Sequence, residues 1–370
     1  MTPYHDPCRA IRLVLKGVPA VLSSGAGLAL LSALLFGAST PLAKLLLRES
    51  DPWMLAGLLY LGSGLGLIAL KAAGRALGSG ARREAAIRGA DWIWLALATL
   101  AGGVVGPVLL MVGLAHTAAT TTALLLNLEG VLTALLAWFV FRENFDRRIA
   151  AGMVAIVAGG LVLAWGGSLV LSAVLGPAAI AGACLGWALD NNLTRKVSQT
   201  DPVQIALLKG IVAGVVNVAV AIGLGSALPR PGVLAAAAGV GFAGYGVSLV
   251  LFVVALRHIG AARTGAYFSL APFFGALIAV MLLRDAVTVQ LVAAGALMAL
   301  GVWLHLTERH AHEHEHHEMA HEHRHEHDEH HQHAHDGTEP PGEPHSHWHV
   351  HVRLRHSHPH FPDLHHRHDH

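Results

Sequence analysis

The chain alternates between long apolar stretches and short polar segments. Ten stretches are each long enough, at about 20 residues, to cross a hydrocarbon layer of roughly 30 Å as a helix. They cover approximately residues 25–47, 53–73, 91–114, 118–141, 148–168, 176–194, 202–224, 233–256, 261–283 and 287–306. An open strand cannot satisfy its backbone hydrogen bonds in lipid. The pattern therefore predicts an all-α integral membrane protein with ten transmembrane helices.

The apolar pattern also repeats along the chain. Residues 112–152 align without a gap with residues 254–294, and 11 of the 41 aligned positions are identical. A duplication made of hydrophobic spans is typical of transporters. Each copy has five spans, an odd number, so the second copy must be inverted relative to the first. We expect a cytoplasmic N-terminal segment (1–24), two inverted five-helix repeats (25–168 and 176–306) and a cytoplasmic tail (307–370).

Composition supports a membrane protein with a polar tail. Hydrophobic residues make up 54% of the chain and charged residues 13%. Residues 1–309 hold 21 Lys and Arg against 12 Asp and Glu, whereas residues 310–370 hold 4 against 12. The membrane part is thus basic and the tail is acidic when histidine is neutral. Two cysteines, Cys8 and Cys184, exclude a disulfide framework.

The basic residues also predict the orientation. With the N-terminus inside, fifteen Lys and Arg fall in inner segments, against Arg48, Arg230 and Arg284 on the outer side. Basic loops stay in the cytoplasm. Both termini are therefore expected in the cytoplasm, with the chain crossing a bacterial inner membrane many times.

Several short motifs together resemble the drug/metabolite transporter superfamily. They are Leu35-Phe36-Gly37-Ala38-Ser39-Thr40-Pro41, Leu270-Ala271-Pro272, and the acidic residues Glu143 and Asp285 that end two aligned spans. Within this superfamily the chain resembles the EamA type over about residues 25–306. The resemblance implies carrier-mediated transport, often export, of small organic solutes. The chain departs from the family pattern at Glu129, which aligns with Ala271.

Glu129 is the most informative polar residue of the spans. It is the thirteenth residue of the 25 in 117–141, so we expect it near the bilayer centre, where a charge costs roughly 2.5 kcal/mol or more. Thr122 and Thr133 lie on the same face of a continuous helix. Glu129 would then be a carboxylate that binds a coupling proton or cation. The alternative is a protonated or paired carboxylate that holds two helices together.

A second polar cluster is Asp190-Asn191-Asn192, close to the inner end of the sixth span. It is a candidate part of the transport path. The alternative is a charge cluster at a helix end, because Arg195 and Lys196 follow. Lys209, about 10 Å into the seventh span at 1.5 Å per residue, would either extend back to the inner surface or pair with Asp190.

No enzyme motif is present. The chain contains no phosphate loop, no nucleophile elbow and no HExxH sequence. We therefore expect a protein that is not an enzyme, needs no cofactor for transport, and takes its energy from an ion or solute gradient. The expected partners are a small-molecule substrate, the lipid bilayer and transition-metal ions, with no nucleic acid. The sequence leaves open whether the chain forms a homodimer.

The tail holds 24 of the 28 histidines. Neutral imidazole binds zinc, nickel, cobalt and copper, so the tail is a candidate site for these ions. The alternative is a hydrophilic, pH-sensitive tail without a metal. The candidate ligands are His310, His312, His314, His316, His317, His321, His323, His325, His327, His345, His347, His349 and His351.

Most of the tail is expected to be disordered, because it has almost no apolar residues with which to build a core. Residues 345–355 differ, since His or Arg alternates there with Ser, Trp, Val and Leu. This period of two predicts a short strand with its histidines on one face. An isolated strand is marginal, so it would need a partner strand, a metal or another chain.

Three functions remain compatible with the sequence. The chain is a metabolite or drug exporter with a metal-binding tail, a transition-metal exporter supplied by that tail, or a membrane-anchored metal buffer or sensor. Cys184 is the one cysteine in the spans, and no span histidine is expected near the midplane. The first function is therefore preferred.

Overall fold

The structure is a computed structural model. It describes residues 25–76, 89, 91–141, 147–165, 171–194, 202–307, 310–316, 319–325, 345–351 and 354–360. For the last four of these ranges it describes the backbone.

The first repeat folds into helices that follow the predicted spans. They are α2 (Gly25–Leu46), α3 (Pro52–Ala76), α4 (Asp91–Ala98), the π-helical segment η1 (Thr99–Val105), α5 (Gly106–His116), α6 (Ala119–Leu125), α7 (Leu128–Phe141) and α8 (Arg147–Ala164). Helices α4, η1 and α5 form one continuous span from Asp91 to His116. A two-residue turn at Leu126 and Asn127 separates α6 from α7.

The second repeat has a similar order of elements. They are α9 (Leu171–Thr194), α10 (Pro202–Gly223), α11 (Pro231–Gly241), the π-helical segment η3 (Phe242–Val247), α12 (Ser248–Phe268), α13 (Ala271–Leu283) and α14 (Val289–Leu306). One helix, α12, stands in place of α5 and α6 and continues through residues 257–260, where the sequence predicted a break between two spans. In the described residues, 8 helical stretches are long and apolar enough to cross a membrane, and Val289–Leu304 is a shorter apolar helix. With the 24 residues of α9, they account for the ten predicted spans.

The two repeats are interrupted at equivalent places. The π-helical segments begin at Thr99 and Phe242, and the breaks in the next span lie at residues 126–127 and 269–270. The two π-helical segments, and likewise the two breaks, are separated by the 142-residue offset of the sequence repeat to within one residue. The sequence pattern predicted continuous spans, because apolar periodicity does not record a single inserted residue or a two-residue turn.

The two inverted repeats are related by a pseudo-twofold axis. Helices α8 and α14 are joined by two hydrogen bonds that this axis relates to each other. Arg148 Nη1 donates to Thr307 O at 3.0 Å, and Gln290 Nε2 donates to Trp165 O at 2.8 Å. Both residues of the first contact are related to those of the second by 142 positions. Each helix therefore uses a side chain near its start to cap the other helix's last carbonyls.

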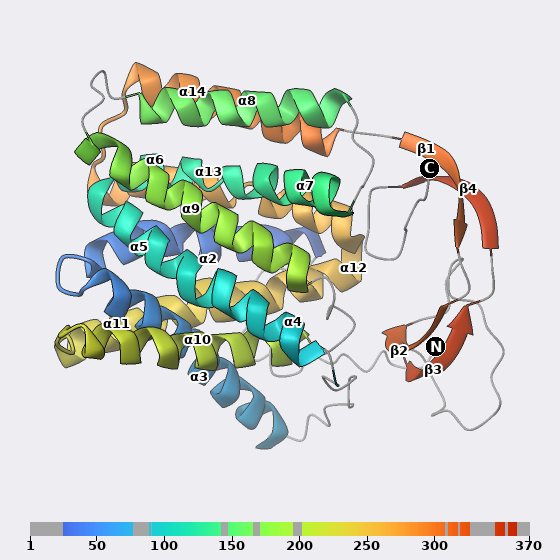
Figure 1. Cartoon of the computed structure of the whole chain (residues 1–370), viewed down its shortest axis with the longest axis horizontal. Helices are drawn as coiled ribbons and strands as arrows, with labels where there is room; N and C mark the ends of the chain where they lie inside the picture. Colours follow the sequence, from blue (N-terminus) through green and yellow to red (C-terminus); the bar gives the residue numbers. More distant parts are fainter. Residues whose placement is uncertain are drawn as a thin grey trace.

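The remaining helices form two groups related by the same pseudo-symmetry (Figure 1). In the first, called the α2 group, α2 packs against α12 and α13. In the second, called the α9 group, α9 packs against α5 and α7. Helix α3 packs against its counterpart α10 between them. We call the end of the bundle where α14 finishes the tail side, and the end where α2 finishes the far side.

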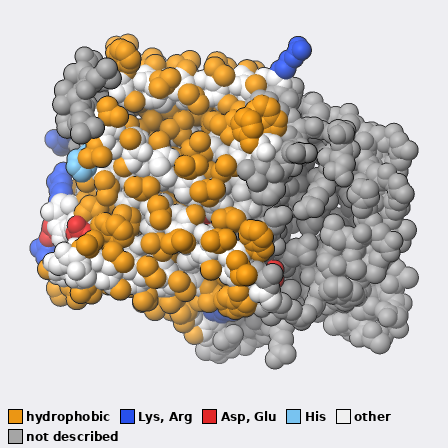
Figure 2. Space-filling view, viewed as in Figure 1, with side chains coloured by type: hydrophobic (Ala, Val, Ile, Leu, Met, Phe, Trp, Pro, Cys, Tyr) orange, Lys and Arg blue, Asp and Glu red, His pale blue; other side chains and the backbone are white. Residues whose placement is uncertain are grey.

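The surface of the bundle is apolar, as a bilayer requires. Figure 2 shows hydrophobic side chains over the visible face of the helices, with charged side chains mainly toward the two ends. Exposed tryptophans lie near helix ends, with Trp92 and Trp138 on the tail side and Trp165 on the far side. Tryptophan is enriched at membrane interfaces. These features, together with the apolar spans, indicate a multi-pass membrane protein.

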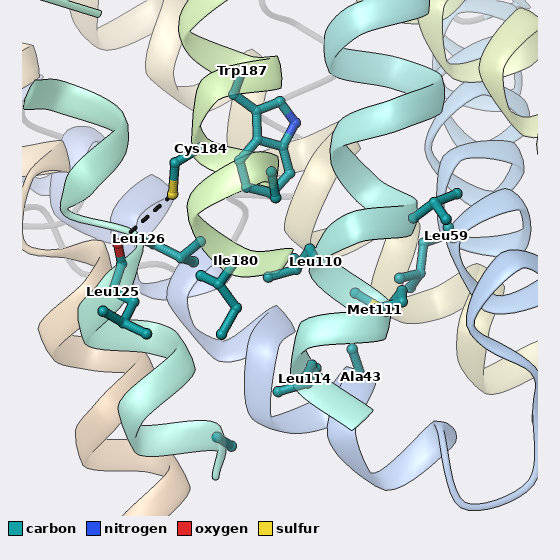
Figure 3. Close-up of a cluster of buried hydrophobic side chains, with 14 of the residues drawn as sticks. Ala43, Leu59, Leu110, Met111, Leu114, Leu125, Leu126, Ile180, Cys184 and Trp187 are labelled. Carbon is teal, nitrogen blue, oxygen red and sulfur yellow. Dashed lines mark hydrogen bonds between the residues drawn. The ribbon is translucent and has the colours of Figure 1, made fainter. Parts of the chain in front are cut away.

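The largest buried cluster joins the two repeats at the middle of the bundle. Figure 3 shows Ile180 and Cys184 of α9 next to Leu110 of α5 and Leu125 of α6. The Cys184 thiol donates to Leu125 O at 3.7 Å, which gives one carbonyl at the break after α6 a partner. The core therefore fixes the position of this break relative to α9.

Four segments of the tail are strands: β1 (His310–His316), β2 (Met319–His325), β3 (His345–His351) and β4 (Leu354–His360). Strand β1 pairs antiparallel with β4, and β2 pairs antiparallel with β3. The strand predicted over 345–355 thus occurs as β3 with a partner, but residues 352–353 separate it from β4. The His-x-His alternation of β1 and β2 has the same period of two, so a strand pattern was also present where disorder was expected.

Glycines allow the helices of the α2 group to touch. A Cβ atom on Gly37 of α2 would lie 2.3 Å from Ala271 O and 3.0 Å from Gly275 N of α13. Both are backbone atoms, so α13 would have to move. A Cβ on Gly239 of α11, in contrast, meets nothing within 4 Å.

We predict that Gly37→Ala destabilises the protein by about 1–3 kcal/mol through overpacking. Gly239→Ala should instead be neutral or stabilising by up to about 1 kcal/mol, because it only restricts the unfolded chain. Thermal unfolding of the detergent-solubilised variants measures both effects. Equal unfolding temperatures for the two variants would contradict the close contact of α2 with α13.

Candidate functional site

The break between α6 and α7 places Glu129 at a helix start. Asn127 lies in the break, and its side-chain amide donates to Leu124 O at 2.9 Å. Helix α7 begins at Leu128, so Glu129 is in its first turn. The free N–H groups and the dipole of a helix start favour a carboxylate there. The break therefore reduces the free-energy cost of placing the Glu129 carboxylate inside a membrane span.

Asn191 of α9 connects Glu129 with Thr133. The Asn191 side-chain amide donates to Glu129 Oε1 at 2.9 Å and lies 3.4 Å from Thr133 Oγ1. The next residue, Asn192, donates to Thr133 O at 3.3 Å. These neutral amides hold α7 against α9, but they do not neutralise a charge. Within the described part of the chain, no cation is paired with Glu129.

Asp190 has a cation of its own. Lys209 Nζ of α10 lies 2.5 Å from Asp190 Oδ1, and the Thr194 hydroxyl donates to the same oxygen at 2.8 Å. The side chains of Lys209 and Asp190 are 16% and 11% exposed. The pair is therefore largely desolvated and electrically neutral as a unit. Of the two alternatives for Lys209, pairing with Asp190 is the one that the structure confirms.

The π-helical segment η1 lies beside this pair and supplies backbone acceptors. Gly102 O accepts from the Tyr60 hydroxyl and from Trp187 Nε1, each at 2.9 Å. Gly103 O accepts from the Asn217 side chain at 3.2 Å. A π-helical insertion disturbs the regular i→i−4 bonding, which leaves carbonyls for side chains of other helices.

Gly102 also makes room for Asp190. A Cβ atom on Gly102 would lie 2.1 Å from Asp190 Oδ2 and 2.4 Å from Asp190 Cβ. A side chain at this position would therefore displace the carboxylate that binds Lys209. The role of Gly102 beside a charged residue follows from the fold, because a glycine in an apolar span indicates no more than close helix packing.

A row of aromatic rings continues from Tyr60 into the α2 group. Its centroid distances are 5.6 Å from Tyr60 to Tyr245, 5.8 Å from Tyr245 to Phe36 and 5.4 Å from Phe36 to Phe268. Such distances are typical of interacting rings. Tyr60 is also close to Asp190 through Gly102, whose carbonyl accepts from the Tyr60 hydroxyl and whose Cα packs against the Asp190 side chain. The two carboxylates and the aromatic row thus border one region between the two helix groups.

The pseudo-symmetry is broken at these positions. Glu129 corresponds to Ala271 at the offset of 142. Asp190 packs on Gly102, and in the same way Ser39 packs on Gly244, the counterpart of Gly102. The α9 group therefore carries the acidic residues of the region, and the corresponding positions of the α2 group are small and uncharged.

Part of the site is exposed near the end of α9. Leu185 and Leu189 are exposed on the lipid-facing side of this helix. Asn191 is also exposed, although it shares a helix face with buried Cys184 and Ala188. Its exposure therefore lies between helices rather than toward lipid. Because α9 ends at Thr194, one turn further on, this opening is on the tail side.

The predicted path residues are only partly brought together. Thr133, Asp190, Asn191, Asn192 and Lys209 lie around or next to Glu129. Thr122 does not take part in this network: its hydroxyl donates to Ala118 O at 2.9 Å and its side chain is fully buried. The turn at residues 126–127 interrupts the continuous helix on which its shared face with Glu129 was predicted.

Tyr60, Trp187 and Asn217 were not among the site residues predicted from the sequence. A tyrosine or tryptophan in an apolar span carries no signal of function by itself, because these residues are common in cores. The bond from Asn217 to Gly103 O joins two helices.

The tail histidines predicted as metal ligands lie outside the description of side chains, and His317 and His327 lie outside the described residues altogether. In the part of the chain where side chains are described, no three His, Cys, Asp or Glu residues gather as a metal would require. The metal prediction for the tail remains a prediction.

Comparison with known proteins identifies the family. The model of the EamA-like transporter family matches residues 23–165 and again residues 174–307. The chain belongs to the EamA-like transporter family. The two matches correspond to the two repeats, and membership makes the protein a membrane transporter.

One relative agrees with this assignment, and one solved structure shares the fold. An uncharacterized transporter of Methanothermobacter thermautotrophicus is 30% identical over 286 residues, which cover 74% of this chain and 83% of that protein. A crystal structure described only as that of a protein has the same fold, with a TM-score of 0.57 at 20% identity, over 76% of this chain and 95% of the other.

The ion pair beside η1 gives a stability prediction for this EamA-like transporter. Lys209→Met leaves the Asp190 carboxylate buried without its partner, which should destabilise the protein by about 3–5 kcal/mol. Adding Asp190→Asn should recover most of this loss, because no buried charge remains. As a control, Arg230→Gln breaks the exposed pair with Glu49 and should cost less than about 1 kcal/mol.

Thermal unfolding in detergent measures all three variants. If the double variant is no more stable than Lys209→Met alone, the desolvated charge is not the cause of the loss.

Proposed function

We propose that this EamA-like transporter is a secondary carrier that exports a small organic solute across the bacterial inner membrane, with Glu129 as the residue that binds the coupling proton or a positively charged group of the substrate. The observation that carries the proposal is the charge balance of the polar region. Asp190 and Lys209 neutralise each other, whereas among the described residues the Glu129 carboxylate is hydrogen-bonded to the neutral amide of Asn191 and has no cation as a partner.

An uncompensated carboxylate inside a membrane span is unfavourable unless it takes up a proton or faces a cation. Glu129 therefore alternates between two states whose charge differs by one. A carrier needs such a change to couple its substrate to an ion gradient. The bond from Asn191 to Glu129 Oε1 leaves the other carboxylate oxygen for the proton or for the substrate.

The direction of transport and the substrate class follow from the surroundings of Glu129. The distribution of basic residues favours a cytoplasmic tail side, and exposed Asn191 lies close to that side. Substrate would then enter from the cytoplasm, as in an exporter. The aromatic row from Tyr60 to Phe268 favours a solute with an apolar or aromatic part, because ring faces bind such groups.

We predict that Glu129→Gln abolishes transport driven by a proton gradient, because glutamine keeps the shape and the Asn191 contact but cannot change its charge. The measurement is substrate flux into proteoliposomes with and without a pH gradient. Glu49→Gln is the matched control, since Glu49 is in an exposed ion pair on the far side and should leave coupling unchanged.

Protein amount and thermal stability of Glu129→Gln should equal those of the unmodified carrier. Coupled flux that survives in this variant would leave Glu129 as a residue that only holds α7 against α9.

The tail supports a second, separate function in metal binding. In the backbone register, His321, His323 and His325 of β2 stand opposite His349, His347 and His345 of β3. Directly opposed residues of an antiparallel pair lie on the same face, with Cβ atoms about 4.5–5.5 Å apart. Pairs of imidazoles at this spacing suit zinc, nickel, cobalt or copper. The tail would then either regulate the carrier, supply metal to it, or act as a buffer.

Deletion of residues 310–370 should remove nearly all metal binding and leave the helices intact, because only His5, His116, His258 and His305 remain. Metal binding to the full chain should weaken as the pH falls through about 6.5, since protonated imidazole is not a ligand. Isothermal titration with zinc and nickel tests both effects.

A full-length variant with asparagine at the tail histidines is the control for length and acidity. If it binds metal as tightly as the unmodified chain, the tail carboxylates or another segment hold the ion. Solute export by the truncated protein distinguishes a regulatory tail from one that supplies the transported metal.

A further inference from the structure

A third polar cluster lies at the far side, at the junction of α5 and α6. Lys44, near the end of α2, donates to Leu114 O, to Thr117 O at 3.0 Å and to Ala115 O at 3.3 Å. These carbonyls belong to the last turn of α5 and to the residue after it, where the helix has no N–H donors of its own to bond them. The Lys44 ammonium therefore caps the negative end of α5 from another helix.

Asp285 caps the start of α6, the second helix of this junction. Its Oδ2 accepts from the backbone N–H of Thr120 at 3.0 Å and from the Thr120 hydroxyl at 3.1 Å. Thr120 is in the first turn of α6, and the residue at the helix cap, Ala118, offers no side-chain oxygen. Asp285 thus supplies the acceptor and the negative charge that this helix start lacks.

The backbone before Asp285 is shaped for this contact. Arg284 ends α13 with φ 57° and ψ 36°, and it is the one non-glycine residue with positive φ among the described residues. A left-handed residue after a helix reverses the chain direction. Here the reversal directs Asp285 toward α6.

Both capping residues come from the α2 group, because Lys44 ends α2 and Asp285 follows α13. The carbonyls that Lys44 caps belong to α5, which is in the α9 group. Helix α6, which contains Thr120, packs mainly against α13 and less against α9. Lys44 therefore joins the two groups at the far side, opposite the end at which Asn191 is exposed, and Asp285 fixes the start of α6 beside α13.

We propose that Lys44, Asp285 and Thr120 form the far-side gate of this carrier. The two side chains hold the α2 group against the α5–α6 junction and close the far end of the region around Glu129. Opening of the far side requires both caps to separate from the junction together. The role as a gate rests on the proposed carrier function, but the contacts themselves are tested without measuring transport.

The geometry also distinguishes capping from a simple ion pair. Lys44 and Asp285 attract each other, but each has its hydrogen bonds with the junction. Exchanging the two charges would restore an ion pair. It would not restore the caps, because an aspartate would then face the carbonyls of α5 and a lysine would face the N–H of Thr120.

The experiment measures access of solvent to Thr122, which is fully buried in α6 two residues after Thr120. A chain with Cys8→Ser and Cys184→Ser carries a single new cysteine through Thr122→Cys. A membrane-impermeant maleimide is added on the side from which Glu49→Cys reacts, which defines the far side. We expect slow labelling, and an increase of about tenfold, equivalent to about 1.4 kcal/mol, in Asp285→Asn and in Lys44→Met.

The control is Arg230→Gln, which breaks an exposed ion pair on the same side and should leave the rate unchanged. The exchanged variant, Lys44→Asp with Asp285→Lys, should label at least as fast as either single variant. Slow labelling of the exchanged variant would show a simple ion pair and overturn the capping mechanism. Unchanged rates in both single variants would overturn the gate.

Thr120→Val removes one hydrogen bond and no charge, so it provides the test if Asp285→Asn does not insert. It should raise the rate by about twofold to fivefold, and an unchanged rate overturns the gate. None of these outcomes depends on Glu129. If Glu129→Gln transports normally while Asp285→Asn still exposes Thr122→Cys, the coupling proposal is wrong and the gate stands.

Discussion

The structure depends on one constraint: inside a hydrocarbon layer every backbone N–H and C=O needs a partner within the protein. A regular helix meets it without help, so most of the bundle is made of uninterrupted helix. The chain departs from regular helix at η1, at η3 and at the breaks near residues 126–127 and 269–270. In η1 and at the first break, side chains of other helices supply the missing partners. Tyr60, Trp187 and Asn217 do so for η1, and Cys184 does so for Leu125 O.

The same constraint explains why the polar residues gather where they do. Asp190 needs Lys209, the pair needs space beside Gly102, and the carbonyls of η1 need donors. Each requirement is met by a residue from a different helix. Duplication provided two equivalent regions for such a network, and the acidic residues of the described network, Glu129 and Asp190, lie in the α9 group. The other half has Ala271 and Ser39 at the equivalent positions.

The amino-acid sequence was sufficient for the architecture and for much of the site. Span length and the 142-residue repeat predicted ten helices and their inversion, and the pairing of Lys209 with Asp190 was one of two alternatives. Glu129 and Asn191 were both found as candidates, but their direct contact was not, because it depends on how α7 crosses α9. Thr122 was placed with Glu129 on a continuous helix, and the turn at Asn127 removed it from the network. Tyr60 and Gly102 could not be found at all, since their role comes from a π-helical insertion that has no signature in hydropathy.

The reciprocal caps between α8 and α14 have a consequence for the history of the chain. Arg148 caps α14 and Gln290 caps α8, while Gly159 and Gly301 sit at equivalent places in the same contact. Such a surface is isologous, with each partner presenting the same patch to the other. A free five-helix chain inserted in both orientations would meet a second copy of itself through this same surface. The covalent link between the repeats makes this contact independent of protein concentration, and it allows the two halves to carry different residues.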